Sequence, residues 1–402
     1  MADTNVDTSQ YPKHTLWYRF FMAVPIRFVI LPIAKWKLKI KTTRYKGPYR
    51  RPCILVYNHV SDYDFIGTVN GFIHYGRYMM SDELIRRGKL KYLIPLSTNG
   101  IFRKKGTSAA SAIEGARETL RRGINVYIAA EGEESPNGVT APIRPKTGQM
   151  IKDMNVDLIT YKMEGGYLIG PKWARNSSKG PMFGHLVNIH PKEKLAEMTP
   201  EEINQLIADD LYFNHYDWIK EKRIPYDREC RAEWMEKVLH RCPRCEQECK
   251  LHSKGDVLAC ECGYKVEVDE YGLFVGDDLV FDNLYDWDMW QKERMRSLRP
   301  EWEAHPDDVI TEDHDCQVGK DVGKEVEEID SGVSLKITFN HLIIEGEKFK
   351  FKEPLNSLNI VSIRNGIGVF FNGTYYRVRV PYVVSMIRYR TIRRIIMNEK
   401  DI

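Results

Sequence analysis

The first half of the chain alternates between two spacings of hydrophobic residues. Short apolar runs such as Cys53–Tyr57 and Asp157–Tyr161 are typical of strands. Between them, residues 81–95 and 107–122 show the wider spacing of helices, and the second helix is predicted to end before Gly123. Alternating strands and helices predict an α/β core with a largely parallel or mixed sheet.

The last seventy residues follow a different pattern, in which short runs alternate apolar and polar side chains and are separated by turns such as Asn372-Gly373. A basic amphipathic helix, Tyr382–Met397, closes the chain. Strands followed by one terminal helix resemble a pleckstrin-homology-like (PH-like) barrel, which we expect over residues 333–402. The predicted strands are Val333–Phe339, Leu342–Ile344, Lys348–Phe351, Ile360–Ile363, Gly368–Phe371 and Thr374–Val380.

The stretch 299–332 is acidic, contains two prolines and has no regular apolar period, so it is predicted to be a linker. Together with a preceding helix it fills residues 271–332. The terminal helix carries four arginines that are expected to lie on a solvated face, with contact to anionic lipid as the alternative. These are Arg388, Arg390, Arg393 and Arg394.

Residues 16–34 are rich in aromatic and aliphatic side chains but are interrupted by two arginines and two prolines. A bilayer span needs about 20 uninterrupted apolar residues, so this stretch is a poor candidate for one. Seven basic residues follow before residue 51, and such a sequence predicts that residues 1–50 dock on an anionic membrane surface. The alternative is an amphipathic helix packed on the globular domain. The polar, acidic first ten residues do not resemble a cleavable signal, so we expect a cytoplasmic protein, peripheral on the cytoplasmic face of the membrane.

Four of the eight cysteines have the spacing of a metal site. Cys242 and Cys245 form one C-x-x-C pair, and Cys260 and Cys262 form a shorter C-x-C pair, which together predict a zinc ribbon over residues 236–270. Four protein ligands leave no open position, so this zinc is predicted to be structural. Because the second pair is one residue short of the usual spacing, three other residues are alternative ligands: Cys249, His240 and His252. Disulfides are the other alternative, which the lack of an export signal disfavours.

His59 and Asp64 follow the first predicted strand and carry the most informative chemistry. A neutral imidazole can take a proton from a hydroxyl near neutral pH, and a carboxylate that accepts its other N–H fixes the tautomer. Ser61 and Asp64 also fit the start of a helix, so capping of backbone amides is the alternative role of Asp64.

The run from Asn58 to Asp64 resembles the NHxSxxD block of the glycerophospholipid acyltransferase family. Three further segments follow in the family's order, within about residues 15–225. They are Asn99–Lys105, which resembles the arginine-containing second block; Asn125–Ser135, in which Glu131-Gly132 matches the third block, FPEGTR; and Lys146–Tyr161, which resembles the approach to the fourth block.

The resemblance implies an acyltransferase domain over residues 51–228, with His59 as the general base and Asp64 orienting it. It implies that Arg103 and Lys104 hold a phosphate, and that Glu131 either holds an acceptor hydroxyl or braces its loop. The expected substrate-binding residues are Asn58, Arg103, Lys104, Glu131 and Gly132. The third block departs from the family, because Glu133 and Glu134 replace its threonine and arginine.

The activity that follows is transfer of a fatty acyl group from acyl-CoA or acyl-ACP to a hydroxyl of a glycerophospholipid precursor such as 1-acylglycerol 3-phosphate. This reaction belongs to phospholipid biosynthesis. The alternative function is a catalytically inactive adaptor that binds membrane or nucleic acid through the ribbon and the terminal barrel. Nucleic acid is the less favoured partner, because no basic stripe with interleaved aromatics surrounds the ribbon and the net charge is only +4.

Overall fold

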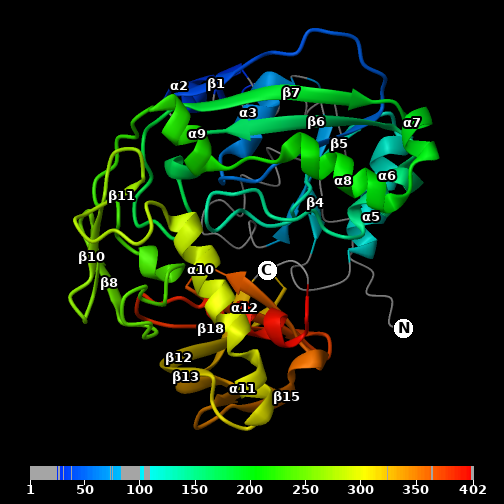
Figure 1. Ribbon diagram of the computed structural model, residues 1–402. Coiled ribbons are helices and arrows are strands. Elements are labelled where there is room, and N and C mark those ends of the chain that lie inside the picture. Colours follow the sequence, from blue (N-terminus) through cyan, green and yellow to red (C-terminus); the bar gives the residue numbers. More distant parts are fainter. Residues whose placement is uncertain are drawn as a thin grey trace. The chain divides into compact units, whose positions relative to one another are not determined.

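The computed structural model describes residues 39–72, 76–82, 100–103, 109–323, 325–363 and 365–399, together with His74 and most of the segment 28–37. The chain forms two compact units (Figure 1). The first is Met1–Pro171 with Ser177–Asp227, and the second is Lys172–Asn176 with Arg228–Ile402. None of the helices in the described part of the chain is long and apolar enough to cross a bilayer.

A seven-stranded mixed sheet forms the centre of the first unit, in the order β1-β7-β6-β2-β5-β3-β4 among the described residues. Strands β2 to β6 are parallel, and β7 runs antiparallel to β6. The predicted α/β core with a mixed sheet is therefore confirmed. The strands are β1 (Ile40–Thr42), β2 (Cys53–Tyr57), β3 (Gly76–Ser81), β4 (Ile101–Arg103), β5 (Asn125–Ala129), β6 (Asp157–Glu164) and β7 (Met182–His190).

Helices cover the sheet because alternate strand residues point to opposite faces. Ile54 and Val56 of β2 pack in one hydrophobic cluster with residues of α5, α6 and α8, whereas Tyr127 of β5 stacks on Tyr78 on the other face. The predicted helix 107–122 is confirmed as α5, and the predicted helix 81–95 lies mostly outside the described residues. The helices are α2 (Leu31–Lys37), α3 (Asp64–Gly71), α5 (Ala110–Arg121), α6 (Thr147–Met154), α7 (Lys192–Glu197), α8 (Pro200–Leu211) and α9 (His215–Lys222).

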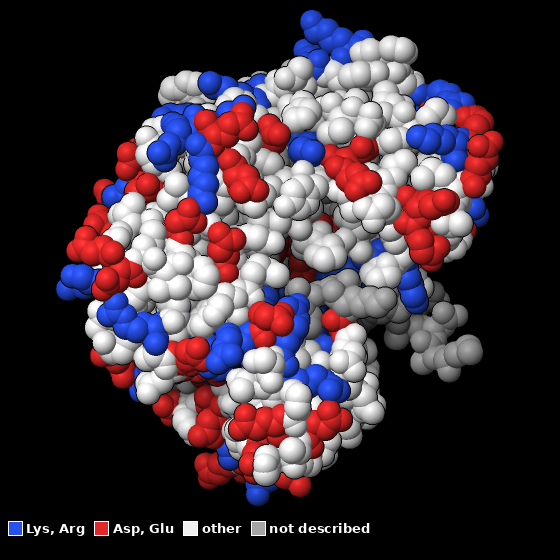
Figure 2. Space-filling model, in the orientation of Figure 1, with Lys and Arg blue, Asp and Glu red and all other residues white. Residues whose placement is uncertain are grey.

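The N-terminal segment exposes large apolar side chains next to basic ones. Phe28 and Trp36 are 69% and 78% exposed. Lys and Arg side chains are visible around the loop that follows β1 (Figure 2). The exposed basic residues of this segment are Lys37, Lys39, Lys41, Arg44, Lys46 and Arg50. The aromatic residues before Pro25 that contributed to the membrane prediction lie outside the described residues.

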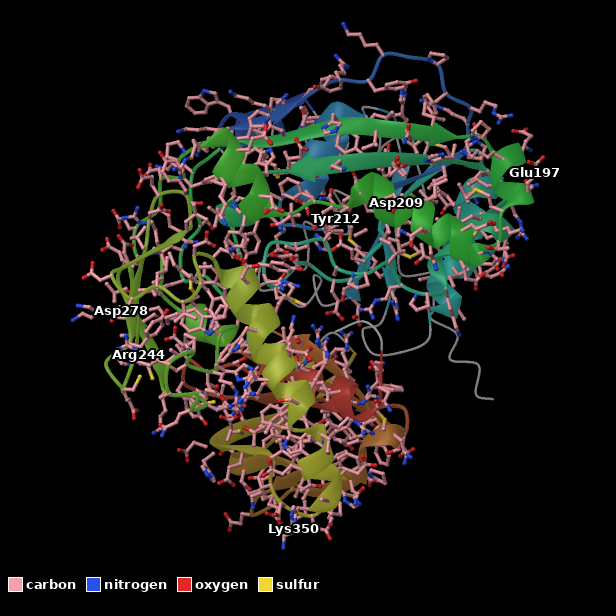
Figure 3. The ribbon with its side chains drawn as sticks, viewed as in Figure 1. Glu197, Asp209, Tyr212, Arg244, Asp278 and Lys350 are labelled. Carbon is pink, nitrogen blue, oxygen red and sulfur yellow. The ribbon has the colours of Figure 1, made fainter. Side chains whose placement is uncertain are left out.

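The second unit contains a small antiparallel sheet in the order β11-β10-β9-β8. Trp287 of α10 is fully buried, packs against Tyr264 and Phe274, and donates its indole N–H to the carbonyl of Arg241 at 2.8 Å. At the surface, Arg244 pairs with Asp278 at 2.7 Å (Figure 3). The elements are β8 (Leu251–Lys254), β9 (Val257–Cys260), β10 (Lys265–Val268), β11 (Phe274–Val275), α10 (Leu284–Ser297) and α11 (Arg299–Ala304).

A seven-stranded antiparallel sheet follows, in the order β15-β14-β13-β12-β18-β17-β16, and helix α12 (Ile387–Ile396) closes it. No hydrogen-bonded pairing joins the edge strands β15 and β16 within the described residues, so the sheet is curled but not a closed barrel. The strands are β12 (Thr311–Val322), β13 (Glu325–Ile337), β14 (His341–Glu345), β15 (Lys350–Pro354), β16 (Asn359–Ile363), β17 (Gly366–Phe371) and β18 (Thr374–Arg379).

The prediction of a linker over residues 299–332 is wrong for most of its length, because α11 occupies its start and β12 and the beginning of β13 pair as a long hairpin. The acidic side chains of this hairpin are mostly exposed, and only a few positions such as Cys316 and Val318 are buried. A strand that buries few of its residues does not need a strong apolar period. The acidic composition of this segment therefore gave no apolar pattern from which β12 and the start of β13 could be predicted.

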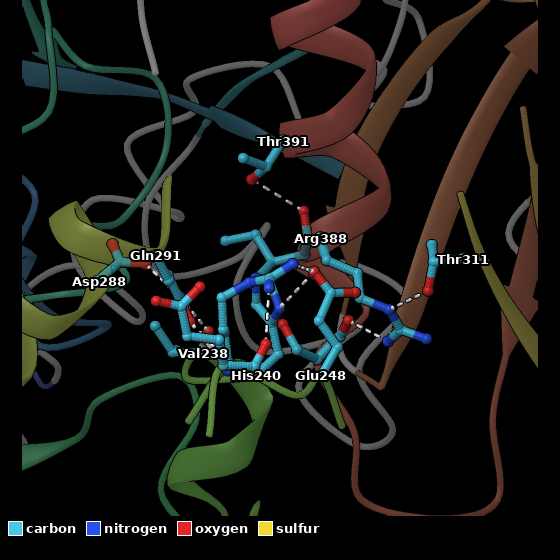
Figure 4. A network of polar contacts seen from close by, with 12 residues as sticks. Val238, His240, Glu248, Asp288, Gln291, Thr311, Arg388 and Thr391 are labelled. Carbon is cyan, nitrogen blue, oxygen red and sulfur yellow. Dashed lines mark hydrogen bonds and ion pairs between the residues drawn. The ribbon is translucent and has the colours of Figure 1, made fainter. Parts of the chain in front are cut away.

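The terminal helix also differs from its prediction, because Arg388 is 1% exposed and not solvated. Its guanidinium pairs with Asp313 of β12 at 2.6 Å, and the hydroxyl of Tyr389 donates to the same carboxylate oxygen at 2.9 Å. Figure 4 shows Arg388 close to His240 and Glu248 at the start of the ribbon. Burial, and then the positive charge of Arg388, lowers the pKa of His240 well below its usual value. The buried ion pair therefore joins α12 to the curled sheet, and Arg388 acts on the ribbon through its charge.

Candidate active site

Three of the predicted site residues meet at the carboxyl edge of the sheet. β2, β5 and β4 are parallel, so their carboxyl ends lie at one edge. His59 follows β2 by two residues, Glu131 follows β5 by two residues, and Arg103 is the last residue of β4. Loops at this edge are where α/β folds place binding and catalytic groups.

His59 and Asp64 form the predicted dyad. Nδ1 of His59 lies 2.9 Å from Oδ2 of Asp64. The His59 side chain is 26% exposed, whereas Asp64 is 1% exposed. Nδ1 is directed at the buried carboxylate, and Nε2 is on the opposite side of the ring, where a general base of this kind exchanges its proton. A general base held by an orienting acid would need this geometry.

Asp64 is itself fixed by the loop that precedes it. Oδ2 accepts hydrogen bonds from the backbone N–H groups of Val60 and Ser61 at 2.8 and 3.0 Å, and Oδ1 accepts one from the Ser61 hydroxyl at 3.0 Å. Helix α3 begins at Asp64, but no side chain caps its N-terminus. Asp64 therefore accepts backbone N–H groups, as its alternative role predicts, and contacts the ring of His59 as well, so the two roles coexist.

Glu131 lies directly behind His59. Its Oε1 accepts the backbone N–H of His59 at 2.8 Å, and its Oε2 accepts the backbone N–H of Ala141 at 3.0 Å. The side chain is buried, and this burial raises the pKa of the Glu131 carboxyl to about 8 in spite of the two hydrogen bonds. Of the two predicted roles, this geometry favours bracing of the loop.

Asn58 is also fully buried, and it extends the sheet by one pair of hydrogen bonds. Its side-chain amide donates to the carbonyl of Met163 at 2.8 Å, and its side-chain carbonyl accepts the Met163 N–H at 2.7 Å. Asn58 therefore joins the end of β2 to β6. This position supports the dyad and offers no exposed group to a substrate.

Two arginines lie near the third block. Arg144 donates from Nε to the carbonyl of Glu131 at 3.0 Å, and its guanidinium pairs with Glu133 at 2.7 Å. Burial, and then the positive charge of Arg144, lowers the pKa of Arg103, while the charge of Glu133 opposes this. Gly132 has φ of +71°, and a side chain there would meet Arg144. Lys104 lies outside the described residues.

Sequence reasoning missed Arg144 because it stands ten residues beyond the position of the arginine in the family's third block. It also missed Ser135, whose backbone N–H donates to the carbonyl of His59 at 3.0 Å. A basic residue in the loop before α6 was visible in the sequence. Its direction toward the Glu131 loop was not.

The four predicted cysteines form a separate cluster in the second unit. The sulfur atoms of Cys242, Cys245, Cys260 and Cys262 all lie within 4.8 Å of one another. Two of the sulfur pairs, Cys242 with Cys262 and Cys245 with Cys260, are separated by 3.7 Å. A tetrahedron with zinc–sulfur bonds of about 2.3 Å has edges of about 3.8 Å, so the donor set fits zinc. The alternative ligands Cys249, His240 and His252 are not part of this cluster.

The match to a known protein family lies within the first unit. Residues 38–164 match the family model described as Acyltransferase. No curated protein is significantly similar to the chain. Among solved structures, the 1-acyl-sn-glycerophosphate (LPA) acyltransferase PlsC from Thermotoga maritima is 19% identical, with a TM-score of 0.38 over 49% of this chain and 81% of that chain.

The family match spans β1 to β6 and contains the dyad, Arg103, Glu131 and Arg144. Residues 38–164 therefore form an acyltransferase domain.

Proposed function

We propose that the protein transfers a fatty acyl group from a thioester, acyl-CoA or acyl-ACP, to a hydroxyl of a lysophospholipid such as 1-acylglycerol 3-phosphate. The observation that carries this proposal is the His59–Asp64 pair, 2.9 Å apart, inside the matched domain and at the carboxyl edge of the sheet. Of the two members of the pair, only the imidazole has appreciable exposure. An adaptor would have no need of this arrangement.

In the proposed reaction, Nε2 of His59 takes the proton from the acceptor hydroxyl, and the oxygen attacks the thioester carbonyl carbon. The Asp64 carboxylate stabilises the imidazolium that forms and keeps its Nδ1–H in place. The carbon–sulfur bond then breaks, and the imidazolium returns its proton to the departing thiolate. The products are an ester and a free thiol, with no net change in protons.

We also propose that Arg103 and Arg144 hold the phosphate of the acceptor. After burial, the positive charge of Arg144 is the next cause that lowers the pKa of Arg103, so the two guanidinium groups repel each other, and a phosphate between them would remove this repulsion. Arg144 would then supply the cation that Glu134 lacks in the third block. Glu133, which pairs with Arg144 in the described structure, would give way to the phosphate.

Arg144→Gln is expected to raise the KM for 1-acylglycerol 3-phosphate about tenfold or more, because a charge-assisted hydrogen bond contributes about 1.5–3 kcal/mol. The KM for monoacylglycerol, which has no phosphate, should not change. Initial rates with labelled acyl-CoA and both acceptors measure this. Arg122→Gln, on the exposed face near the end of α5, is the control. An equal loss with both acceptors would refute the phosphate assignment.

For the N-terminal segment we propose peripheral docking on the cytoplasmic face of an anionic membrane. Exposed aromatic side chains stand beside lysines and arginines that neutralise anionic headgroups. Helix α2 contacts α3, the helix that begins at Asp64, so docking there would bring the dyad near lipid substrates.

Trp36→Ala is expected to weaken binding to mixed phosphatidylcholine–phosphatidylglycerol vesicles about tenfold, since a large apolar side chain contributes about 1.5 kcal/mol or more when it leaves water. Sedimentation with vesicles measures the partition. Tyr212→Ala at the end of α8 (Figure 3), an aromatic residue that is 56% exposed, is the matched control. Equal binding by wild type and Trp36→Ala would count against docking through this segment.

The finer assignments in the second unit are also proposals. We propose that the four cysteines hold a structural zinc ion, which has no open position for substrate. We propose that the curled sheet with α12 is a PH-like domain, because its strand order places the first strand beside the last and a helix follows.

A further inference from the structure

The loop that follows β5 makes hydrogen bonds to the peptide groups on both sides of His59. The His59 N–H donates to Oε1 of Glu131 at 2.8 Å, and the His59 carbonyl accepts the Ser135 N–H at 3.0 Å. The ring is fixed separately by Asp64 at 2.9 Å. Three independent contacts therefore set the position of one side chain.

Glu131 is poorly placed to touch a substrate. It is 2% exposed, and each carboxylate oxygen already accepts a backbone N–H, one from His59 and one from Ala141. A hydroxyl that bound to this carboxylate would have to enter a buried position and compete with those bonds. The two donors come from segments 82 residues apart, so the carboxylate joins the loop after β2 to the loop before α6.

Burying an acidic side chain costs free energy of folding unless hydrogen bonds compensate for the lost water. The burial of Glu131 therefore indicates a structural or functional role. Its pKa is raised mainly by burial, and the two backbone N–H groups act in the opposite direction by favouring the ionised form. Because each of its two oxygens accepts a backbone N–H, the buried Glu131 side chain holds the two backbone segments at a fixed distance.

We propose that Glu131 is a positioning residue for the acyl transfer reaction, acting through the backbone of His59 and not on the substrate. The Glu131 carboxylate holds the backbone N–H of His59, the Ser135 N–H holds its carbonyl, and Asp64 holds its ring. This inference rests on the proposed function, because it assumes that His59 is the base. The glutamate of the third block would then keep the imidazole of His59 in the position that proton transfer requires.

The test is Glu131→Gln, which keeps the shape but presents one amide NH₂ group to a backbone N–H. One buried donor then loses its acceptor, and the His59 peptide can shift. A displacement of the order of 1 Å costs about a hundredfold in rate. We therefore expect kcat, expressed per folded molecule, to fall about 30- to 100-fold, with the acceptor KM unchanged within about twofold.

Asp157→Asn is the matched control for stability. Asp157 is also buried and accepts a backbone N–H, from Lys192 at 2.9 Å, but it starts β6 beside Cys53 at the opposite edge of the sheet. It should lower the melting temperature without lowering kcat. Near-UV circular dichroism gives the folded fraction of each variant.

The second measurement places Glu131→Gln in the His59→Ala background. If Glu131 acts only through the imidazole, the double variant keeps the residual activity of His59→Ala within about twofold. A rise of the acceptor KM by tenfold or more in the single variant, or a further large loss in the double variant, would show that Glu131 acts on the substrate or on the fold. Normal kcat in Glu131→Gln with an inactive His59→Ala overturns this inference alone. Full activity in His59→Ala overturns the proposed function itself.

Discussion

His59→Ala is expected to lower kcat for acyl transfer about a thousandfold, the largest catalytic effect of any single change in this chain. A positioned general base contributes about 10²- to 10⁴-fold, and no other described imidazole lies at this edge of the sheet with a buried carboxylate on its Nδ1. Labelled acyl-CoA with 1-acylglycerol 3-phosphate measures the loss. The KM values should change little, because the imidazole acts in the transition state.

The fold offers a matched control for this experiment. His190, at the end of β7, pairs through Nε2 with Asp210 of α8 at 2.7 Å. Its side chain is 8% exposed, compared with 26% for His59. Asp210 also accepts bonds from Thr160 and Asn188, so this second pair fastens α8 to the sheet. His190→Ala should reduce stability and leave kcat per folded molecule near wild type. Equal losses in the two variants would mean that His59 is structural.

Asp64→Asn separates orientation from charge at the same site. The asparagine can still accept one hydrogen bond, but it does not stabilise the imidazolium, so we expect kcat to fall about a hundredfold. Full activity in this variant would contradict the orienting role.

Much of the first unit could be predicted from local patterns. A continuous apolar run such as Cys53–Tyr57 is typical of a strand that is buried on both faces of a parallel sheet. Parallel strands bring their carboxyl ends together at one edge. Thus the meeting of His59, Arg103 and Glu131 follows from strand direction once the strands are known. Four cysteines at ribbon spacing are similarly constrained by the tetrahedral preference of the metal.

What could not be predicted depends on contacts between distant residues. Asn58 and Glu131 match family blocks, but the sequence does not show whether such a side chain meets the substrate or pairs with backbone. Arg388 looked like a solvated arginine because its partner, Asp313, lies 75 residues earlier. The β12–β13 hairpin was hidden because paired strands satisfy backbone groups whatever the charge of their outward side chains.

Removal of the proposed zinc is expected to have the largest effect on stability. The ribbon sheet has only four short strands and a small core around Tyr264, Phe274 and Trp287, and small domains of this kind depend on their metal. Freshly purified protein should contain one zinc ion per chain. Binding of structural zinc by thiolates is worth about 10–16 kcal/mol, far more than such a core supplies.

Cys260→Ser should therefore lower the zinc content well below one per chain and unfold the ribbon, and a strong chelator should do the same to wild type. Cys249→Ser is the matched control, because Cys249 lies in the same segment but outside the sulfur cluster. Zinc analysis and circular dichroism measure both effects. Because α10 and α12 contact each other beyond the ribbon and Arg388 lies close to His240 and Glu248, loss of the metal should also lower the melting temperature of the curled sheet. A zinc-free protein with an intact ribbon and four reactive thiols would show that the cysteines serve another purpose.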